Sequence, residues 1–437
     1  MDTNKKLYFV DKSTHMDKRS FIKSMGSFGL AAWTWPLAAG DQKLVEHHTL
    51  VPIEEEETLW KTVRGHYVLK PDYINLESGY YNIIPQPTLE KFKAHIDAVN
   101  REGSYYMRNQ LNTDKVTLRK RMAAWMDCDT EELVITRNTT ESLDLIIAGY
   151  PWQKGDEAIY AEQDYGAMKV MFEQVADRYG VVNKVVSVPN HPKSDEEIVA
   201  LYEAQITPKT RLLMVCHMIN ITGQILPIKK ICDMAHRHGV EVLVDGAHCV
   251  GHFAYSLRDL GCDYYGSSLH KWLATPLGAG LLYINKKRIA QIWPLLADYI
   301  KEVGDIKRLN HLGTHPVHTN LAIHNALDYL EWIGMERKEK RMRFLQNYWT
   351  SKLRSVPQVV INTPDDPQRH CGIGNVGIRH LRPAALAQQL LEDHQIFTVA
   401  IDYANVQGCR ITPNVFTTTE ELDHFVEAIK TLAQEVS

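Results

Sequence analysis

The sequence has little of several features that would each indicate a particular class of protein. Seven cysteines occur among 437 residues, and none forms a C-x-x-C pair. This odd, scattered set argues against a disulfide framework or a zinc site, so we interpret the cysteines as core thiols. No apolar run approaches the ~20 residues that a membrane span needs. The formal net charge is only −4, which does not favour a nucleic-acid partner.

Two other signals are also missing. No G-x-G-x-x-G follows an early strand, so a doubly wound nucleotide-binding oxidoreductase is disfavoured. His311, His315 and His318 have no cysteine or carboxylate at ligand spacing, so no metal site is predicted. The composition is otherwise that of a globular protein, with 44% hydrophobic and 23% charged residues. A chain of this length is expected to form one or two domains.

The stretch 242–272 combines two strand-like runs that end in chemically active side chains. The run 240–244 ends in the letters DGAH, and the run 263–267 ends in SLHK. In an open α/β sheet, the carboxyl ends of the strands face the ligand crevice. We therefore expect Asp245 and Lys271 to face the same pocket.

A carboxylate and a lysine in this arrangement suit pyridoxal phosphate (PLP). The lysine amine forms a Schiff base with the aldehyde, and the carboxylate keeps the pyridine nitrogen protonated so that the ring can accept electrons. Taken separately, Lys271 could be a surface lysine and Asp245 a helix cap. The two together, in this order, favour a cofactor site.

The motifs VDGAH and SSLHKW, with the C-terminal RITPNVFTTTEELD, resemble the class V aminotransferase family of fold-type I PLP enzymes. This family includes cysteine desulfurases, selenocysteine lyases and isopenicillin N epimerase-like proteins, and the epimerase-like branch is the most similar. The resemblance runs from about residue 73 to the C-terminus. It implies an α/β fold with a mainly parallel seven-stranded sheet between helices, in which 278–285 forms the antiparallel edge, and a small α+β C-terminal domain.

The predicted organisation has four segments. These are a leader with a disordered segment (1–45), an arm that joins the small domain (46–75), a large PLP-binding domain (76–330) and a small domain (331–437). The leader letters DKRSFIK resemble a twin-arginine export signal with Lys18 in place of the first arginine. They predict a periplasmic protein. A basic tail on a cytoplasmic protein is the alternative, and both cleavage and a start at Met16 stay open.

The resemblance implies roles for the residues around the cofactor. Lys271 would bond to PLP, Asp245 would pair with the ring nitrogen, and Tyr165 would stack on the ring. The remaining implied cofactor contacts are Thr139, Thr140, Asn220, His248, Ser268, His270 and, across a subunit interface, Thr314. The helix start at Thr139 also suits phosphate on physical grounds, because free N–H groups and the helix dipole attract anions. A capping role for Thr139 and a turn role for Asn220 are the structural alternatives.

Arg410 would bind the substrate carboxylate, because a guanidinium stays charged and binds two oxygens at once. A surface salt bridge is the alternative. The segment YINLESGYYN would supply Tyr80, Tyr81 and Asn82 as substrate contacts, although packing explains them equally well. Tyrosines 80, 81, 105, 106 and 165 would form an aromatic mouth that permits a substrate larger than a free amino acid.

These features together predict a PLP-dependent homodimeric enzyme with active sites near the subunit interface. It would act on an amino acid or a peptide-like small molecule through an external aldimine, by transamination or epimerisation. A C–S lyase, a periplasmic peptide- or siderophore-tailoring enzyme and a non-catalytic PLP-fold binding protein are alternatives. In the family, cysteine desulfurases use a mobile nucleophilic cysteine in the loop before the carboxylate-binding arginine. That activity is disfavoured here, because the loop 400–407 lacks cysteine and Cys409 lies beside Arg410, within the expected strand. Tyr165, a poor base at neutral pH, also replaces the histidine that desulfurases use.

Overall fold

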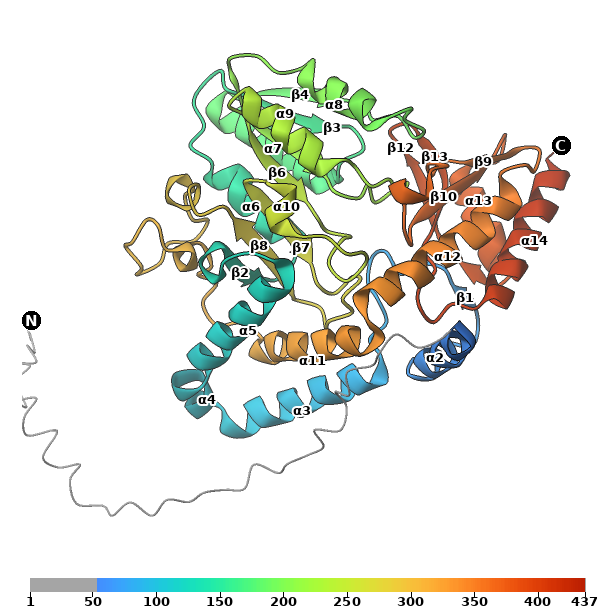
Figure 1. Cartoon of the computed structure of the whole chain (residues 1–437), viewed down its shortest axis with the longest axis horizontal. Coiled ribbons are helices and arrows are strands. Elements are labelled where there is room, and N and C mark those ends of the chain that lie inside the picture. Colours follow the sequence, from blue (N-terminus) through green and yellow to red (C-terminus); the bar gives the residue numbers. More distant parts are fainter. Residues whose placement is uncertain (1–52, 437) are drawn as a thin grey trace, which may run out of the picture. The chain divides into compact units, whose positions relative to one another are not determined.

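The structure, a computed structural model, describes residues 53–436 (Figure 1). The predicted leader and the first part of the predicted arm lie outside these residues. Within them, no helix is both long enough and apolar enough to cross a membrane. The predicted domain boundaries stay a prediction.

A seven-stranded sheet forms the centre of the large domain, in the order β2-β8-β7-β6-β5-β3-β4. Its strands are β2 (Leu133–Thr136), β3 (Glu157–Ala161), β4 (Val182–Val186), β5 (Thr210–Cys216), β6 (Glu241–Asp245), β7 (Tyr264–Ser268) and β8 (Gly280–Ile284). Strands β3 to β7 run parallel, as predicted. However, β8 is not the edge strand, because β2 pairs antiparallel with its outer side.

The sheet is buried on both faces, and successive residues of each central strand enter opposite hydrophobic clusters. In β6, Val242 and Val244 join one cluster, whereas Leu243 joins the other. The first cluster includes residues of α5 (Leu111–Met126), α8 (Asp195–Glu203), α9 (Ile228–Arg237), α10 (Leu257–Leu260) and α11 (Val317–Ile333). The second includes residues of α6 (Thr139–Gly149) and α7 (Gly166–Tyr179). Burial on both sides explains why these strands are continuous apolar runs.

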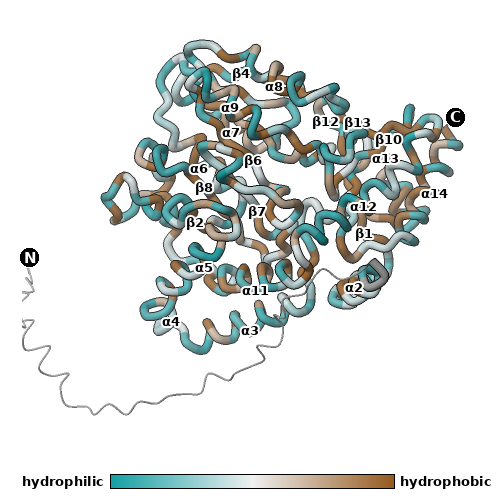
Figure 2. Tube along the Cα trace, viewed as in Figure 1, coloured by the Kyte–Doolittle hydropathy of each residue, from teal (hydrophilic) through white to brown (hydrophobic). Residues whose placement is uncertain are grey.

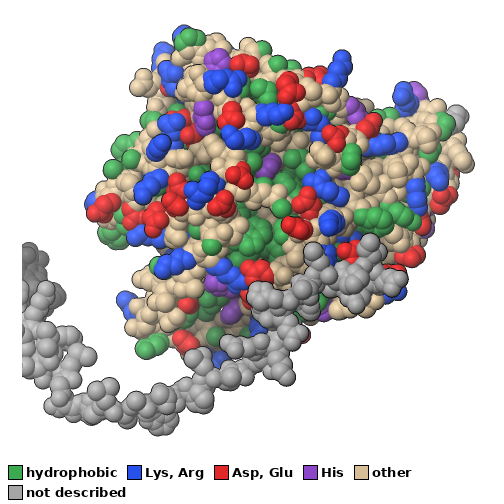
Figure 3. Space-filling model, in the orientation of Figure 1, with side chains coloured by type: hydrophobic (Ala, Val, Ile, Leu, Met, Phe, Trp, Pro, Cys, Tyr) green, Lys and Arg blue, Asp and Glu red, His purple; other side chains and the backbone are tan. Residues whose placement is uncertain are grey.

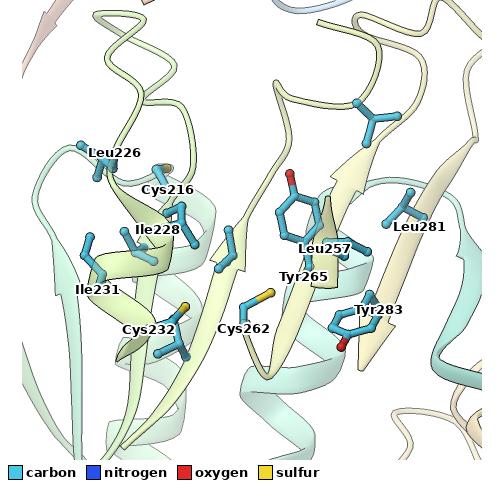
Figure 4. Packing of buried hydrophobic residues seen from close by; sticks show 14 of the residues in the cluster. Cys216, Leu226, Ile228, Ile231, Cys232, Leu257, Cys262, Tyr265, Leu281 and Tyr283 are labelled. Carbon is cyan, nitrogen blue, oxygen red and sulfur yellow. The ribbon is translucent and has the colours of Figure 1, made fainter. Parts of the chain in front are cut away.

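Part of the first cluster is shown in Figure 4, where three cysteines lie among the aliphatic and aromatic side chains. Cys216, Cys232 and Cys262 are all buried and unbridged. Along α11, hydrophobic and hydrophilic colours alternate in Figure 2, as expected of a helix with one buried face. On the face shown in Figure 3, basic and acidic side chains are interspersed rather than gathered by sign.

The small domain contains a four-stranded antiparallel sheet in the order β12-β13-β10-β9. Its strands are β9 (Val359–Ile361), β10 (Gly374–Ile378), β12 (Val399–Tyr403) and β13 (Val406–Ile411). Its helices are α12 (Met335–Leu353), α13 (Pro383–Glu392) and α14 (Thr419–Glu435). The predicted α+β character of this domain is confirmed.

The segment that precedes the large sheet in sequence pairs with the small domain. Strand β1 (Ile74–Asn75) pairs in parallel with β11 (Ile396–Phe397). The other N-terminal elements are α2 (Ile53–Gly65), α3 (Gln86–Glu102) and α4 (Ser104–Asn109). Helix α3 follows the extended residue Pro85 and packs along α11. The residues between β1 and α3 therefore lead from the small domain to the large domain.

Candidate active site

A pocket of about 390 Å³ lies at the carboxyl ends of β5, β6 and β7. It also receives residues from the N-termini of α6 and α7 and from β13. Of the residues predicted from sequence, the following line it: Tyr80, Thr139, Thr140, Tyr165, Asn220, Asp245, His248, Ser268, His270, Lys271 and Arg410. Strand ends that are distant in sequence thus place a carboxylate, an amine and a guanidinium around one cavity.

The amine of Lys271 faces a histidine whose tautomer is fixed. Lys271 Nζ lies 3.1 Å from His248 Nε2, and Trp272 Nε1 donates to His248 Nδ1 at 3.2 Å. Because an indole N–H can only donate, Nδ1 is the acceptor and the neutral ring carries its proton on Nε2. That proton can be donated to Lys271 only when the amine is unprotonated. Sequence analysis noted Trp272 only as part of a family motif and missed this role.

Burial also favours the unprotonated form of the Lys271 amine. It lowers the pKa of Lys271 to about 8, an effect that Asp245 opposes and Arg410 reinforces. Burial, followed by the Lys271 charge, likewise lowers the pKa of His248. Relative to an ordinary lysine pKa of ~10.4, this raises the unprotonated fraction at pH 7 from about 0.04% to about 10%. A reactive amine is therefore available near neutral pH.

Asp245 ends β6 as a buried carboxylate with few partners. Its Oδ1 accepts from the Ala247 N–H at 3.0 Å, and its Oδ2 has the Cys216 thiol at 3.9 Å. Burial raises the pKa of Asp245, since the site holds the charged form poorly. A cation placed against this carboxylate would stabilise it. The protonated ring nitrogen of PLP is such a cation.

The start of α6 offers hydrogen-bond donors that suit a phosphate. The Thr139 N–H donates to Ser268 Oγ at 2.9 Å, and their hydroxyls lie 2.7 Å apart. The Thr140 N–H has no acceptor within the described residues, and His270 Nδ1 is buried without a partner. Thr140 and His270 both line the cavity, from neighbouring elements. They fit an anion at a helix N-terminus, so the residues present are compatible with PLP.

The cap of α6 differs from the predicted alternative. Asn138, rather than Thr139, is the N-cap, and its Oδ1 accepts from the Glu141 N–H at 2.9 Å. Asn138 has extended backbone, whereas Thr139 is already helical, so only the former can turn its side chain back onto the helix end. The hydroxyl of Thr139 is thereby left for Ser268 and the pocket.

Three residues predicted for the site do not line the pocket in this chain. Tyr81 is half-buried away from it, and Thr314 is exposed on the segment before α11. Asn82 is buried, with its Oδ1 accepting from Asn414 Nδ2 at 2.8 Å and its N–H donating to His270 O at 3.2 Å. Asn82 thus positions the backbone beside Lys271 instead of facing the cavity.

The predicted aromatic mouth is smaller than expected. Tyr80 and Tyr165 line the pocket, but Tyr105 and Tyr106 do not. Both of the latter belong to α4, where Tyr105 is exposed and Tyr106 donates to Asp114 Oδ2 at 2.8 Å. The short helix α4 therefore carries this aromatic pair away from the pocket and packs one member on α5.

Arg410 of β13 reaches the pocket already paired with a residue that sequence analysis missed. Its Nε donates to Glu77 Oε2 at 3.1 Å and its Nη2 to Glu77 Oε1 at 2.6 Å. The two side chains are only 8% and 5% exposed, so this is a buried ion pair and not a surface salt bridge. Removing one partner of such a pair typically costs about 3–5 kcal/mol. The only signal was a lone carboxylate in the otherwise uncharged segment YINLESGYYN.

Comparisons with known proteins agree with this geometry. The family model described as Aminotransferase class-V matches residues 84–423. Isopenicillin N epimerase of Streptomyces clavuligerus is 27% identical over 396 residues, covering 86% of this chain and 99% of that protein. A probable cysteine desulfurase of Halalkalibacterium halodurans is 29% identical over 276 residues, covering 60% of this chain and 66% of that protein.

Among solved structures, a variant of the cystine C–S lyase C-DES, with glycine covalently linked to its PLP cofactor, is similar in fold. The TM-score is 0.75 at 23% identity, and the match covers 84% of this chain and 98% of that one.

The lowered pKa of Lys271 predicts how its reactivity depends on pH. In cofactor-free protein, reductive methylation of Lys271 should rise with pH to a midpoint of about 8, because only the unprotonated amine reacts. Peptide mass spectrometry of samples labelled at several pH values measures this. Exposed lysines should still be gaining label near pH ~10. A Lys271 midpoint near theirs would contradict the inferred environment.

Proposed function

The chain belongs to the class V aminotransferase family of PLP-dependent enzymes, and on that premise we propose that it removes and returns the proton on the amine-bearing carbon of its substrate. Transamination or epimerisation would be the outcome. The observation that carries this proposal is the buried Lys271 amine, which has a pKa of about 8 and lies against His248. When bound, PLP supplies an electron sink for the carbanion that proton removal leaves.

Each end of the pocket has a distinct task in this proposal. The start of α6, with Thr139 and Thr140, would hold the phosphate, and Asp245 would hold the ring nitrogen. Lys271 would hold the aldehyde and, once released by the incoming amine, would act as the base that accepts the proton. The neutral His248 beside it adds no positive charge that would oppose this transfer.

Two observations bear on the choice between the outcomes. The similarity to isopenicillin N epimerase spans 99% of that protein, which supports epimerisation. Transamination needs only the one base that the pocket clearly supplies. Epimerisation also needs a proton donor on the face opposite Lys271, and Tyr165, the N-cap residue of α7, lines the same pocket.

We also propose that the protein is not a cysteine desulfurase, although proteins of that name are among its relatives. The segment 400–407, which contains no cysteine, forms the hairpin of β12 and β13. Cys409 is fully buried on β13, with its thiol donating to Pro383 O at 3.6 Å. Burial raises the pKa of Cys409 to about 12, so its thiolate is scarce.

Replacing Lys271 tests the proposal directly. Purified wild-type protein supplied with PLP should show a visible absorption band from the lysine-bound cofactor. The Lys271→Ala variant should lose this band, together with at least ~10³-fold of any turnover, because it lacks both the attachment point and the base. Absorption spectra and amino-acid titrations measure both effects. A wild-type protein that stays colourless after PLP is added would contradict the assignment of PLP to Lys271.

The same titrations in deuterated water separate the outcomes. Loss of the visible band towards a pyridoxamine spectrum indicates transamination, whereas deuterium entering the amine-bearing carbon with the band retained indicates epimerisation. Free cysteine should release no sulfide beyond the level seen with Lys271→Ala. Stoichiometric sulfide release would overturn the exclusion of desulfurase activity.

We propose a homodimer as the working form. The segment before α11 exposes large apolar side chains, among them Trp293 at 71% and Tyr299 at 91% exposure. It leads directly to Thr314, the residue predicted to act across a subunit interface. Sedimentation should give about twice the 50.0 kDa chain mass, and a monomer at micromolar concentration would contradict the proposal.

We further propose export by the twin-arginine route, supported by the letters DKRSFIK ahead of the described residues. A route that carries folded proteins suits an enzyme that acquires its cofactor in the cytoplasm. In a bacterial host, the full chain should appear in the periplasm. Arg19→Lys should keep it in the cytoplasm, and equal export of both proteins would argue against this signal.

A further inference from the structure

Two distant parts of the chain hold the guanidinium of Arg410. Glu77 takes the edge formed by Nε and Nη2, at 3.1 and 2.6 Å. The third nitrogen, Nη1, donates to the Asn220 carbonyl oxygen at 3.3 Å. Three of the five guanidinium N–H groups are therefore engaged before any substrate arrives. The group is held in place, and its charge is offset.

The carboxylate of Glu77 is itself fixed. Its Oε1 also accepts from the Tyr80 N–H at 2.9 Å, and the Glu77 N–H donates to Asn75 Oδ1 at 3.1 Å. A Cβ on Gly79 would lie 2.9 Å from Arg410 Cζ, so the guanidinium packs directly against the glycine backbone. A side chain at Gly79 would therefore require the Arg410 guanidinium to shift.

Glu77 lies behind Arg410 as seen from the cavity. Arg410, Gly79 and Tyr80 line the pocket, whereas Glu77 does not. A ligand thus meets the guanidinium while its counter-ion is already in place on the far side. Both partners are nearly excluded from water, so solvent screens their charges poorly.

This arrangement weakens the attraction for a free carboxylate next to the reacting amine. Such a carboxylate would meet a neutralised guanidinium and would bring a second negative charge close to Glu77. Releasing Glu77 instead would leave that carboxylate buried without its partner. A neutral carbonyl needs only one of the two remaining N–H groups and adds no charge.

We propose that Glu77 is a specificity-determining residue, and that the site accepts amines whose neighbouring carboxyl is blocked as an amide. Amino-acid amides and the N-terminal residues of peptides belong to this class. The inference rests on the proposed function of the same site. In the single chain the pocket rim carries exposed side chains, with Tyr80 79% exposed, Leu277 61% and Tyr165 49%.

Matched ligand pairs test this inference on PLP-loaded wild type and Glu77→Gln. The probes are L-alanine, L-phenylalanine, their α-amides and the dipeptide Phe-Ala. Dissociation constants come from the change in the visible band, and kcat/KM from turnover. The wild type should bind each amide at least as tightly as its acid. Glu77→Gln should shift the acid-to-amide affinity ratio at least fivefold towards the acid, because glutamine keeps an acceptor for the Tyr80 N–H but removes the charge.

Glu331→Gln is a control for the same chemical change at a more exposed arginine pair. It removes a carboxylate from another arginine pair, Glu331 with Arg121 at 2.9 Å, away from the pocket, and should leave the ratio unchanged. Thermal unfolding shows whether each variant is folded, and the wild-type ratio tests the inference without any variant.

A wild type that binds the acids more tightly than their amides, or a Glu77→Gln shift that is smaller than fivefold or opposite, would overturn the proposal. Failure of every probe to bind to either protein would also overturn the proposal. In Glu77→Gln the charge of Arg410 is no longer offset, so that variant should bind at least the acids. Absence of the lysine-dependent band would instead overturn the proposed function, which keeps the two failures distinct.

Discussion

The desolvation of Lys271 is the constraint on which the rest of the site depends. Burial at the end of β7 disfavours the ammonium form of Lys271, and the nearby Arg410 charge acts in the same direction. Trp272 donates to His248 Nδ1 and so leaves the Nε2 proton of the neutral ring directed at that amine, and the Trp272 ring stacks on His252 with the ring centroids 3.7 Å apart. His252 in turn donates to the His248 carbonyl oxygen and accepts from the Gly372 N–H, both at 2.8 Å. The tautomers beside the reactive amine are therefore fixed partly by the small domain.

The two ends of the pocket follow opposite electrostatic rules. Asp245 is a buried carboxylate that forms no ion pair within the described residues, and burial outweighs the effect of the nearby Lys271 on its pKa, so a positively charged group of a bound cofactor would complete it. Arg410 is a buried cation whose counter-ion is already present in Glu77. One end requires a charge from its ligand and the other does not. This asymmetry would orient a cofactor through its ring nitrogen and, in our proposal, leaves the substrate end tolerant of neutral groups.

Local patterns and the family resemblance together predicted most of the fold and named most of the residues that line the cofactor half of the pocket. Apolar runs identified the central strands, and the motifs after β6 and β7 placed Asp245 and Lys271 together because those strands are parallel neighbours. Strand order is not encoded locally, so β8 was taken for the edge strand. The pairing of Glu77 with Arg410 joins residues 333 positions apart, which no local pattern reveals. The cap at Asn138 differs from the expected one by a single residue, a distinction that only backbone geometry makes.

That long separation also sets an order of events during synthesis. The groups that face the cofactor lie between Thr139 and Lys271, so they leave the ribosome well before Arg410 does. Glu77 is synthesised first, but its ion-pair partner Arg410 is synthesised 333 residues later. Strand β1, which precedes Glu77, likewise cannot pair until β11 has been synthesised. The nascent protein can therefore assemble its cofactor-facing half during translation, but the end that selects substrates closes only after nearly the whole chain has been made.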